Sequence, residues 1–305
     1  MANLKEVRNR IISVNSTQQI TKAMKMVSAA KLKRAVDASA TMAPYAQKLT
    51  EMIENIGPEL GDLQNIYAQK REVKKVLLVI VTSNRGLAGA FNSNIIRMAY
   101  NYIRETYLGT MKMEDIQILA IGKKGFEFFK RRGFTILDNS SDIFNDLKYQ
   151  ASSKIADQIM HGFERGDWDR VELFYNRFKN AALQFQEKIT LLPVQNLGKE
   201  LVETEIMDGK VKSFGLINNY IFEPSIERLV EYLVPESIRA SVYSSLLSSF
   251  AAEHGARMTS MDKATDNAAE LLRAYKLQYN RARQASITNE ILEIVSGANA
   301  LENAG

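Results

Sequence analysis

Apolar and small side chains recur at helical spacing along both ends of this chain of 305 residues. From Glu236 to Ser296 the sequence contains no proline and a single glycine, Gly255, which predicts one very long helix. At about 1.5 Å per residue this helix would extend roughly 90 Å, whereas a compact globule of this chain length is about 50 Å across, so we expect it to project from any globular body. The N-terminal segment lacks glycine and proline before Pro44 and predicts a second long helix, closed at Gly57, that pairs antiparallel with the first.

The spacing within both ends is typical of a coiled coil, because one face repeats at alternating intervals of three and four residues. The residues of this face are Leu4, Val7, Ile11 and Val14 at one end and Met258, Met261, Thr265, Ala268, Leu272, Tyr275, Tyr279 and Ala282 at the other. Each pattern then shifts, which predicts a local change of supercoiling: the first resumes as Ile20, Met24 and Val27, and the second as Ile287, Ile291 and Ile294. Since the seams contain few leucines, the coil is expected to be weak alone and surrounded by other protein; an ordinary helical hairpin of a larger bundle is the alternative.

Between these helices the pattern changes to short apolar runs separated by amphipathic stretches. The runs cover residues 75–82, 116–122, 134–137 and 170–178, which predicts βαβ units and a mainly parallel sheet. The alternating segment 183–194 follows directly and predicts an antiparallel edge strand.

The predicted fold is therefore α/β, with three parts. An N-terminal coiled-coil helix covers residues 1–57, a Rossmann-like domain covers 75–222, and a C-terminal helix covers 225–301 and completes the coil. Pro235 lies inside this last segment, and a kink or break is expected there because proline lacks an amide donor and clashes with the preceding turn.

The net charge of +5 is concentrated at the chain ends. Residues 1–34 hold only one acid, Glu6, and the basic residues Lys5, Arg8, Arg10, Lys22, Lys25, Lys31, Lys33 and Arg34. A second basic cluster consists of Arg273, Lys276, Arg281 and Arg283, and antiparallel pairing would bring it near the first. An acidic partner is expected, with nucleic acid or a merely solvated helix face as alternatives.

The sequence offers little for catalysis. It has no cysteine, which excludes disulfides and thiolate chemistry, and its two histidines, His161 and His254, have no partner at metal-ligand spacing. The glycine-containing segment 83–92 has neither the spacing nor the lysine of a phosphate-binding loop, which favours a tight turn. The segment GKKG at 122–125 is interpreted as a strand-to-helix turn with exposed lysines. The longest aliphatic run, 76–81, is too short to cross a bilayer. We therefore predict no catalytic, cofactor or metal residues, no direct membrane insertion and no enzymatic activity.

Long motifs at both ends resemble the gamma subunit of F-type ATP synthases. They are KEVRNRIISVNSTQQITKAMKMVSAAKLKRA at 5–35, ARMTSMDKATDNA at 256–268 and YNRARQASITNEILEIVSGANAL at 279–301. The turn SNRGLAGAFN also resembles the family's turn after its first strand, although family members often have aspartate and cysteine where this chain has Asn84 and Ala88. The resemblance implies a central rotor shaft that catalyses nothing itself. It would couple proton-driven rotation of the membrane ring to conformational change at the catalytic sites of the head.

The resemblance also implies partners, which are the alpha and beta subunits of the head, the epsilon subunit and the ring of c subunits, with no cofactor and no nucleic acid. Residues in the matching motifs that would contact the beta subunit are Lys22, Met24, Lys25, Arg283, Gln284 and Thr288. Residues that resemble the foot on the membrane ring are Tyr220, Phe222 and Glu223. Coil packing, solvation or a strand end are the alternative roles of these residues.

The family motif begins at Lys5, so no transit peptide is expected. The expected location is the cytoplasmic face of a bacterial plasma membrane, with the matrix side of the mitochondrial inner membrane as the alternative. Two other functions remain open at this stage. One is a basic coiled-coil protein that binds nucleic acid, with an affinity that falls steeply with salt. The other is an α/β enzyme with a helical dimerisation arm that binds a nucleotide near Gly86 and Gly89.

Overall fold

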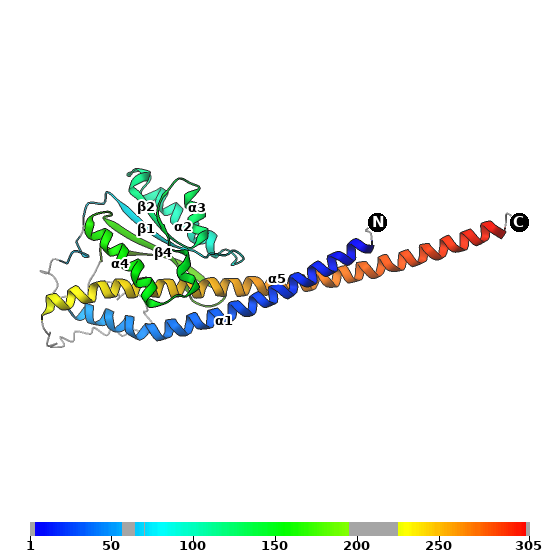
Figure 1. Ribbon diagram of the computed structural model, residues 1–305, viewed down its shortest axis with the longest axis horizontal. Coiled ribbons are helices and arrows are strands. Elements are labelled where there is room, and N and C mark those ends of the chain that lie inside the picture. Colours follow the sequence, from blue (N-terminus) through cyan, green and yellow to red (C-terminus); the bar gives the residue numbers. More distant parts are fainter. Residues whose placement is uncertain (1–3, 57–64, 70, 195–224, 303–305) are drawn as a thin grey trace, which may run out of the picture. The chain divides into compact units, whose positions relative to one another are not determined.

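The computed structural model of the protein describes residues 4–56, 65–69, 71–194 and 225–302 (Figure 1). These residues belong to two compact units, one formed by Met1–Ala29 with Arg257–Gly305 and the other by Ala30–Ala256. The two long helices, α1 (Leu4–Ile56) and α5 (Ile226–Glu302), each contribute to both units.

The first unit is an antiparallel pair of helices, as predicted. The hydroxyl groups of Thr21 on α1 and Thr265 on α5 share a hydrogen bond of 2.8 Å. One turn further along α1, Lys25 forms an ion pair with Asp262, which lies earlier in α5. Because the partner's residue number falls as that of α1 rises, the two helices run in opposite directions. The fold class predicted from the sequence, a coil of the chain ends plus an α/β domain, is confirmed.

The seam predicted in α5 is also confirmed, since all eight of its residues from Met258 to Ala282 are buried or half-buried. The shift predicted in α1 is wrong. Ile20 and Val27 are 60% and 58% exposed, whereas Thr21 and Ser28 are only 8% and 2% exposed. Helix α1 therefore keeps its heptad spacing through polar positions.

Hydrogen bonding explains why polar residues are tolerated in this seam. A buried hydroxyl is costly only when it lacks a partner. In addition to the bond that they share, the Thr21 hydroxyl lies 3.0 Å from the carbonyl oxygen of Gln18 and the Thr265 hydroxyl lies 2.7 Å from that of Met261. At Thr21 and Thr265 the heptad position, rather than hydrophobicity, therefore determines which residue enters the seam.

Two neighbouring leucines of α5 provide a test of this seam. Leu272 is 9% exposed and Leu271 is 49% exposed. We expect Leu272→Ala to destabilise the coil by about 2–3 kcal/mol, because it removes a buried side chain and leaves a cavity. The matched variant Leu271→Ala should cost less than about 1 kcal/mol. Hydrogen exchange of the α5 amides between Met258 and Ala282 measures both changes, and equal protection in the two variants would contradict the seam.

The second unit contains a sheet of five strands, in the order β3-β2-β1-β4-β5. The strands are β1 (Val76–Val81), β2 (Ile116–Ile121), β3 (Thr135–Asn139), β4 (Arg170–Phe178) and β5 (Gln184–Leu192). The first four are parallel, and β5 joins β4 antiparallel at the edge, as predicted. The helices between strands are α2 (Phe91–Thr106), α3 (Lys123–Lys130) and α4 (Tyr149–Arg165), and two 3-10 turns cover Met113–Asp115 and Ser141–Asn145.

Helices cover both faces of this sheet (Figure 1). Alternate residues of β1 point to opposite faces, so Leu78 packs with residues of α2 and α3, while Val79 packs with residues of α4, α1 and α5. All six residues of β1 are fully buried, as expected for a central parallel strand. The unit is thus a three-layer α/β domain whose second helical layer includes parts of both long helices.

Helix α5 continues through Pro235, so the predicted break at this position is wrong. Proline inside a helix costs about 3 kcal/mol, because it lacks the amide donor and crowds the preceding turn. Its neighbours Leu233, Val234 and Ile238 are at most 3% exposed within the domain core, and each such side chain contributes about 1.5–3 kcal/mol. Packing on both sides of the proline therefore outweighs its cost.

Candidate functional site

In the first unit, the C-terminal part of α5 is the surface with the least packing against other described residues. Every residue from 283 to 299 is exposed. The register explains this exposure. Heptad steps from Thr21 and Thr265 place Val7 level with Tyr279, and the first described residue of α1, Leu4, level with Ala282. No residue in the described part of α1 therefore faces α5 beyond Ala282.

This part of α5 is nevertheless apolar on one side. Its large exposed side chains are Ile287, Ile291, Leu292, Ile294 and Val295, which are 47%, 55%, 57%, 71% and 50% exposed. In an ideal helix they spread over about 160° of the circumference, which is wider than the seam of a two-stranded coil. The stripe predicted to resume at Ile287, Ile291 and Ile294 is thus present, but no described residue of α1 lies opposite it. An exposed apolar face of this width indicates a surface that contacts another protein.

Three residues that the family resemblance assigned to the beta subunit lie on this segment. Arg283 is exposed and makes no ion pair within the part of the chain that the structure describes. Gln284 and Thr288 are exposed one turn apart, and the Thr288 hydroxyl donates a 2.9 Å hydrogen bond to the carbonyl oxygen of Gln284. The guanidinium of Arg283 and the amide of Gln284 therefore remain available to a partner.

The other three assigned residues lie further along the coil. Lys22 is exposed, Met24 is half-buried, and Lys25 forms the ion pair with Asp262. The sequence did not reveal this ion pair, because nothing in the spacing identifies a partner 237 residues away before the register is known. At about 1.5 Å per residue, Arg283 lies roughly 30 Å from the level of Lys25. The six residues thus form two separate surfaces.

The antiparallel register also brings part of the two basic clusters to one level of the coil. Heptad steps place Arg8 and Arg10 beside the stretch of α5 that holds Lys276 and Arg281. Arg10 is already paired with Glu6 at 2.5 Å. Lys31, by contrast, lies on the part of α1 that belongs to the α/β unit.

The foot residues Tyr220, Phe222 and Glu223 lie outside the described residues, and their predicted role remains a prediction.

The turn that follows β1 uses its polar groups internally. The amide of Ser83 donates to the side-chain oxygen of Asn92 at 2.9 Å, and the side-chain amide of Asn84 donates to the carbonyl of Ser141 at 2.7 Å. Asn84 also accepts from the amide of Lys123, the first residue of α3, at 3.1 Å. These contacts join the ends of β1 and β2 and favour a structural turn over a phosphate-binding loop.

Neither histidine belongs to a described group of side chains that could ligate a metal ion. His161 is exposed and lies 3.2 Å from Glu164, and His254 is buried beside the ring of Phe250. Across residues 4–56, 65–69, 71–194 and 225–302, no group of three His, Cys, Asp or Glu side chains is placed to hold a metal ion. Among the same residues, no helix has an apolar stretch of the length needed to cross a membrane.

The antiparallel coil of the two chain ends, with an α/β domain between them in the sequence, defines a coiled-coil subunit with an inserted α/β domain. The family model described as ATP synthase matches residues 3–301, and the chain belongs to this family. It is 49% identical over 304 residues to the ATP synthase gamma chain of Cytophaga hutchinsonii, covering 99% of this chain and 100% of the relative. It is also 49% identical over 303 residues to the gamma chain of Flavobacterium psychrophilum, covering 99% and 100%.

Solved structures share the fold. A chain of the Tetrahymena thermophila mitochondrial ATP synthase, from its central stalk and c-ring, matches with a TM-score of 0.55 and 27% identity, covering 80% of this chain and 99% of that chain. A chain of the Euglena gracilis mitochondrial ATP synthase matches with a TM-score of 0.62 and 22% identity, covering 98% and 94%. The family assignment does not support the nucleic-acid alternative.

Proposed function

We propose that this protein is the central stalk, or rotor, subunit of an F-type ATP synthase. In this role it turns with the membrane ring of c subunits and changes the conformation of the catalytic sites in the alpha/beta head. The observation that carries the proposal is the full-length similarity to gamma chains, found in a chain whose α5 extends past its own coil with a wide apolar face.

The shaft acts by unequal contact. A single helix is not symmetric about its axis, so the apolar side of α5 near Ile291 and its opposite side near Glu293 present different chemistry to the surroundings. A site that contacts one side is favoured in one conformation, and a site that contacts the other side is favoured in another. Rotation then changes each site in turn. The subunit supplies no catalytic group in this mechanism.

The residues with the strongest case for a partner are Arg283, Gln284 and Thr288, which we assign to the beta subunit. A second contact with the same subunit is formed by Lys22, Met24 and Lys25, which lie further along the coil from the C-terminal end of α5. Lys25 is paired with Asp262 within the chain. In some rotational positions, a carboxylate of the beta subunit would replace Asp262 as its partner. Tyr220, Phe222 and Glu223 contact the c-ring, and the epsilon subunit completes the stalk.

The proposed location is the cytoplasmic face of a bacterial plasma membrane. The relatives reported above from Cytophaga and Flavobacterium support a bacterial source. The matrix side of the mitochondrial inner membrane is the alternative.

The proposal as a whole is tested by co-expression with the alpha and beta subunits encoded in the same genome. We expect a complex of fixed stoichiometry that hydrolyses ATP and that does not form without this chain. A chain that stays separate from both subunits, although it is folded by circular dichroism, would contradict the proposal.

The site assignment is tested by replacing Arg283 and Gln284 together with alanine in the assembled complex. Loss of two polar contacts at the shaft should reduce coupled ATP synthesis by about tenfold, while the chain alone keeps its helix content. The matched control replaces Lys154 and Gln158 with alanine, because they are also a cation and an amide and are exposed on α4 of the α/β domain. Equal synthesis rates in the two double variants would remove the assignment.

A further inference from the structure

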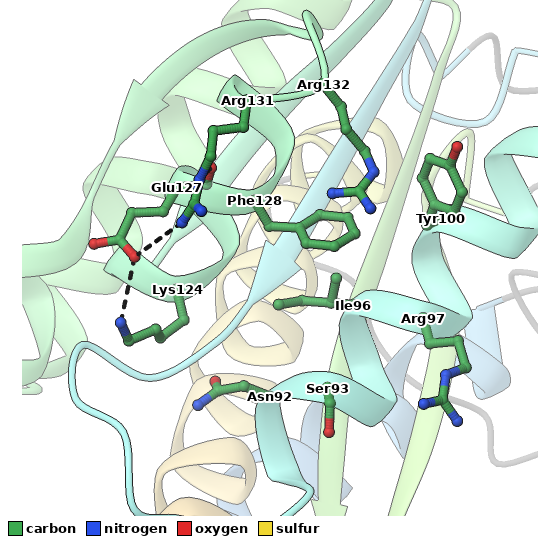
Figure 2. A pocket seen from close by; sticks show the side chains of 10 residues that line it. All are labelled: Asn92, Ser93, Ile96, Arg97, Tyr100, Lys124, Glu127, Phe128, Arg131 and Arg132. Carbon is green, nitrogen blue, oxygen red and sulfur yellow. Dashed lines mark hydrogen bonds and ion pairs between the residues drawn. The ribbon is translucent and has the colours of Figure 1, made fainter.

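A groove lies between helices α2 and α3 of the α/β domain (Figure 2). Its volume of about 590 Å³ is in the range of natural ligand sites. It is lined by Asn92, Ser93, Ile96, Arg97, Tyr100, Lys124, Glu127, Phe128, Arg131 and Arg132. The groove adjoins the turn at residues 83–92, because Asn92 lines its edge and also accepts a hydrogen bond from the amide of Ser83.

One end of the groove holds an arginine that is positioned by aromatic rings. The guanidinium of Arg132 lies 3.6 Å from the ring centre of Phe128 and 5.2 Å from that of Tyr100 (Figure 2). Contact with the ring faces holds the guanidinium in place but uses none of its five N–H donors. Within the part of the chain that the structure describes, no carboxylate forms an ion pair with Arg132. The donors of this guanidinium therefore remain available to an anion.

A second cation lies nearby on α2. Arg97 lines the same groove, is exposed, and forms no ion pair with any described residue. Ile96, next to it in sequence and 8% exposed, and Phe128 form an apolar floor between the two arginines (Figure 2). This end of the groove thus combines an excess of positive charge with an apolar surface.

At the other end, two cations share one carboxylate. Glu127 lies 3.3 Å from the ammonium of Lys124 and 3.8 Å from the guanidinium of Arg131. The two cations without an ion pair to a described carboxylate, Arg97 and Arg132, lie on either side of the apolar floor, and a compact polyphosphate would leave that floor without an apolar partner. A carboxylate on an extended chain needs only one arginine at a time, and Arg97 and Arg132 are suited to two such groups separated by an apolar contact.

From this arrangement we infer that the α2–α3 groove docks an acidic segment of a protein partner. An apolar side chain of the segment packs on Ile96 and Phe128, and carboxylates on either side of it bind Arg97 and Arg132. The inference does not depend on the proposed rotor function, because no residue of the coil takes part.

The test uses the full chain and a fluorescein-labelled peptide that carries one leucine flanked on both sides by glutamates. We expect saturable binding by fluorescence anisotropy, and about tenfold weaker binding in Arg97→Glu and in Arg132→Gln. The matched control is Lys154→Glu, an exposed position on α4, which covers the other face of the sheet. A peptide with glutamines in place of the glutamates should bind no variant.

Because the coil is also basic, the location of the peptide is measured separately. The chain has no cysteine, so a benzophenone label can be placed at a single introduced cysteine, either Ser93→Cys in the groove or Lys154→Cys outside it. Cross-linking from Ser93→Cys alone supports the inference. Peptide binding that is unchanged in Arg97→Glu and Arg132→Gln would overturn it. So would binding of inorganic triphosphate, but not of the peptide, with the same dependence on the two arginines.

Discussion

Replacing Gly122 with alanine is expected to prevent stable folding of the α/β domain. Gly122 joins β2 to α3 with a φ of 116°, a conformation that side chains rarely adopt. A Cβ atom there would lie 2.1 Å from the carbonyl oxygen of Thr82 and 2.6 Å from its carbonyl carbon. Since these are main-chain atoms at the end of the central strand, they cannot move aside without disturbing the sheet. We expect a loss of about 4 kcal/mol or more in the free energy of unfolding.

The measurement is urea unfolding of the full chain followed by circular dichroism, together with the soluble yield. Gly86 provides the matched glycine-to-alanine control, because a Cβ atom at that position meets no atom within 4 Å. Gly86→Ala should change the free energy of unfolding by less than about 1 kcal/mol. If Gly122→Ala unfolded at the same urea concentration as Gly86→Ala, the predicted clash between the new Cβ atom and the main chain of Thr82 would be wrong.

Replacing Glu236 with glutamine should destabilise the same domain by about 2 kcal/mol at neutral pH, because it removes the charge from a group that joins three helices. The carboxylate of Glu236 on α5 accepts hydrogen bonds from Tyr45 of α1 at 2.8 Å, from Tyr149 of α4, and from Arg239 at 3.1 Å. Arg239 also donates to Asp157 of α4 at 2.7 Å. The network lies directly after Pro235, where it helps to hold the helix in place.

This stabilisation depends on pH in a defined direction. Burial alone would raise the pKa of Glu236, but hydrogen bonds from Tyr149, Tyr45 and Arg239 outweigh burial and lower the pKa below its usual value of about 4.5. The unfolded chain therefore binds the proton more readily than the folded chain. The contribution is complete above about pH 4.5 and is lost as the pH falls through the lower, folded-state pKa.

The difference in the free energy of unfolding between wild type and Glu236→Gln should therefore have its full value at pH 7 and decrease below about pH 4. Urea unfolding at several pH values measures it. Glu231→Gln is the matched control, because Glu231 is exposed on the same helix and should show no difference at either pH. A free-energy difference between wild type and Glu236→Gln that stays constant down to pH 3 would contradict the role of the charged carboxylate.

The strongest sequence signals predicted the fold correctly. The six aliphatic residues of β1 and the alternating spacing from Met258 to Ala282 each admit one burial pattern, and the structure has both. The errors arose where a local sequence rule was outweighed by tertiary packing. Pro235 predicted a break, but the surrounding core keeps the helix continuous. The hydrophobicity of Ile20 and Val27 placed them in the seam, but the heptad register buries Thr21 and Ser28 instead.

The candidate site was predictable in part. Family motifs placed Arg283, Gln284 and Thr288 on a helix, and their exposure agrees with a role in binding. The pairing of Lys25 with Asp262 required the register of two segments far apart in the chain. The α2–α3 groove had no sequence signal, because its arginines stand out only when Phe128 and Tyr100 are seen to orient one of them.

The end of α5 beyond Ala282 has a mechanical consequence. A solitary helix in water is held only by its own amide-to-carbonyl bonds, which open readily near a free end. Under the proposed rotor function, the head subunits that surround this end would therefore also stiffen it against bending. The shaft would then transmit torque only once the head is assembled around it.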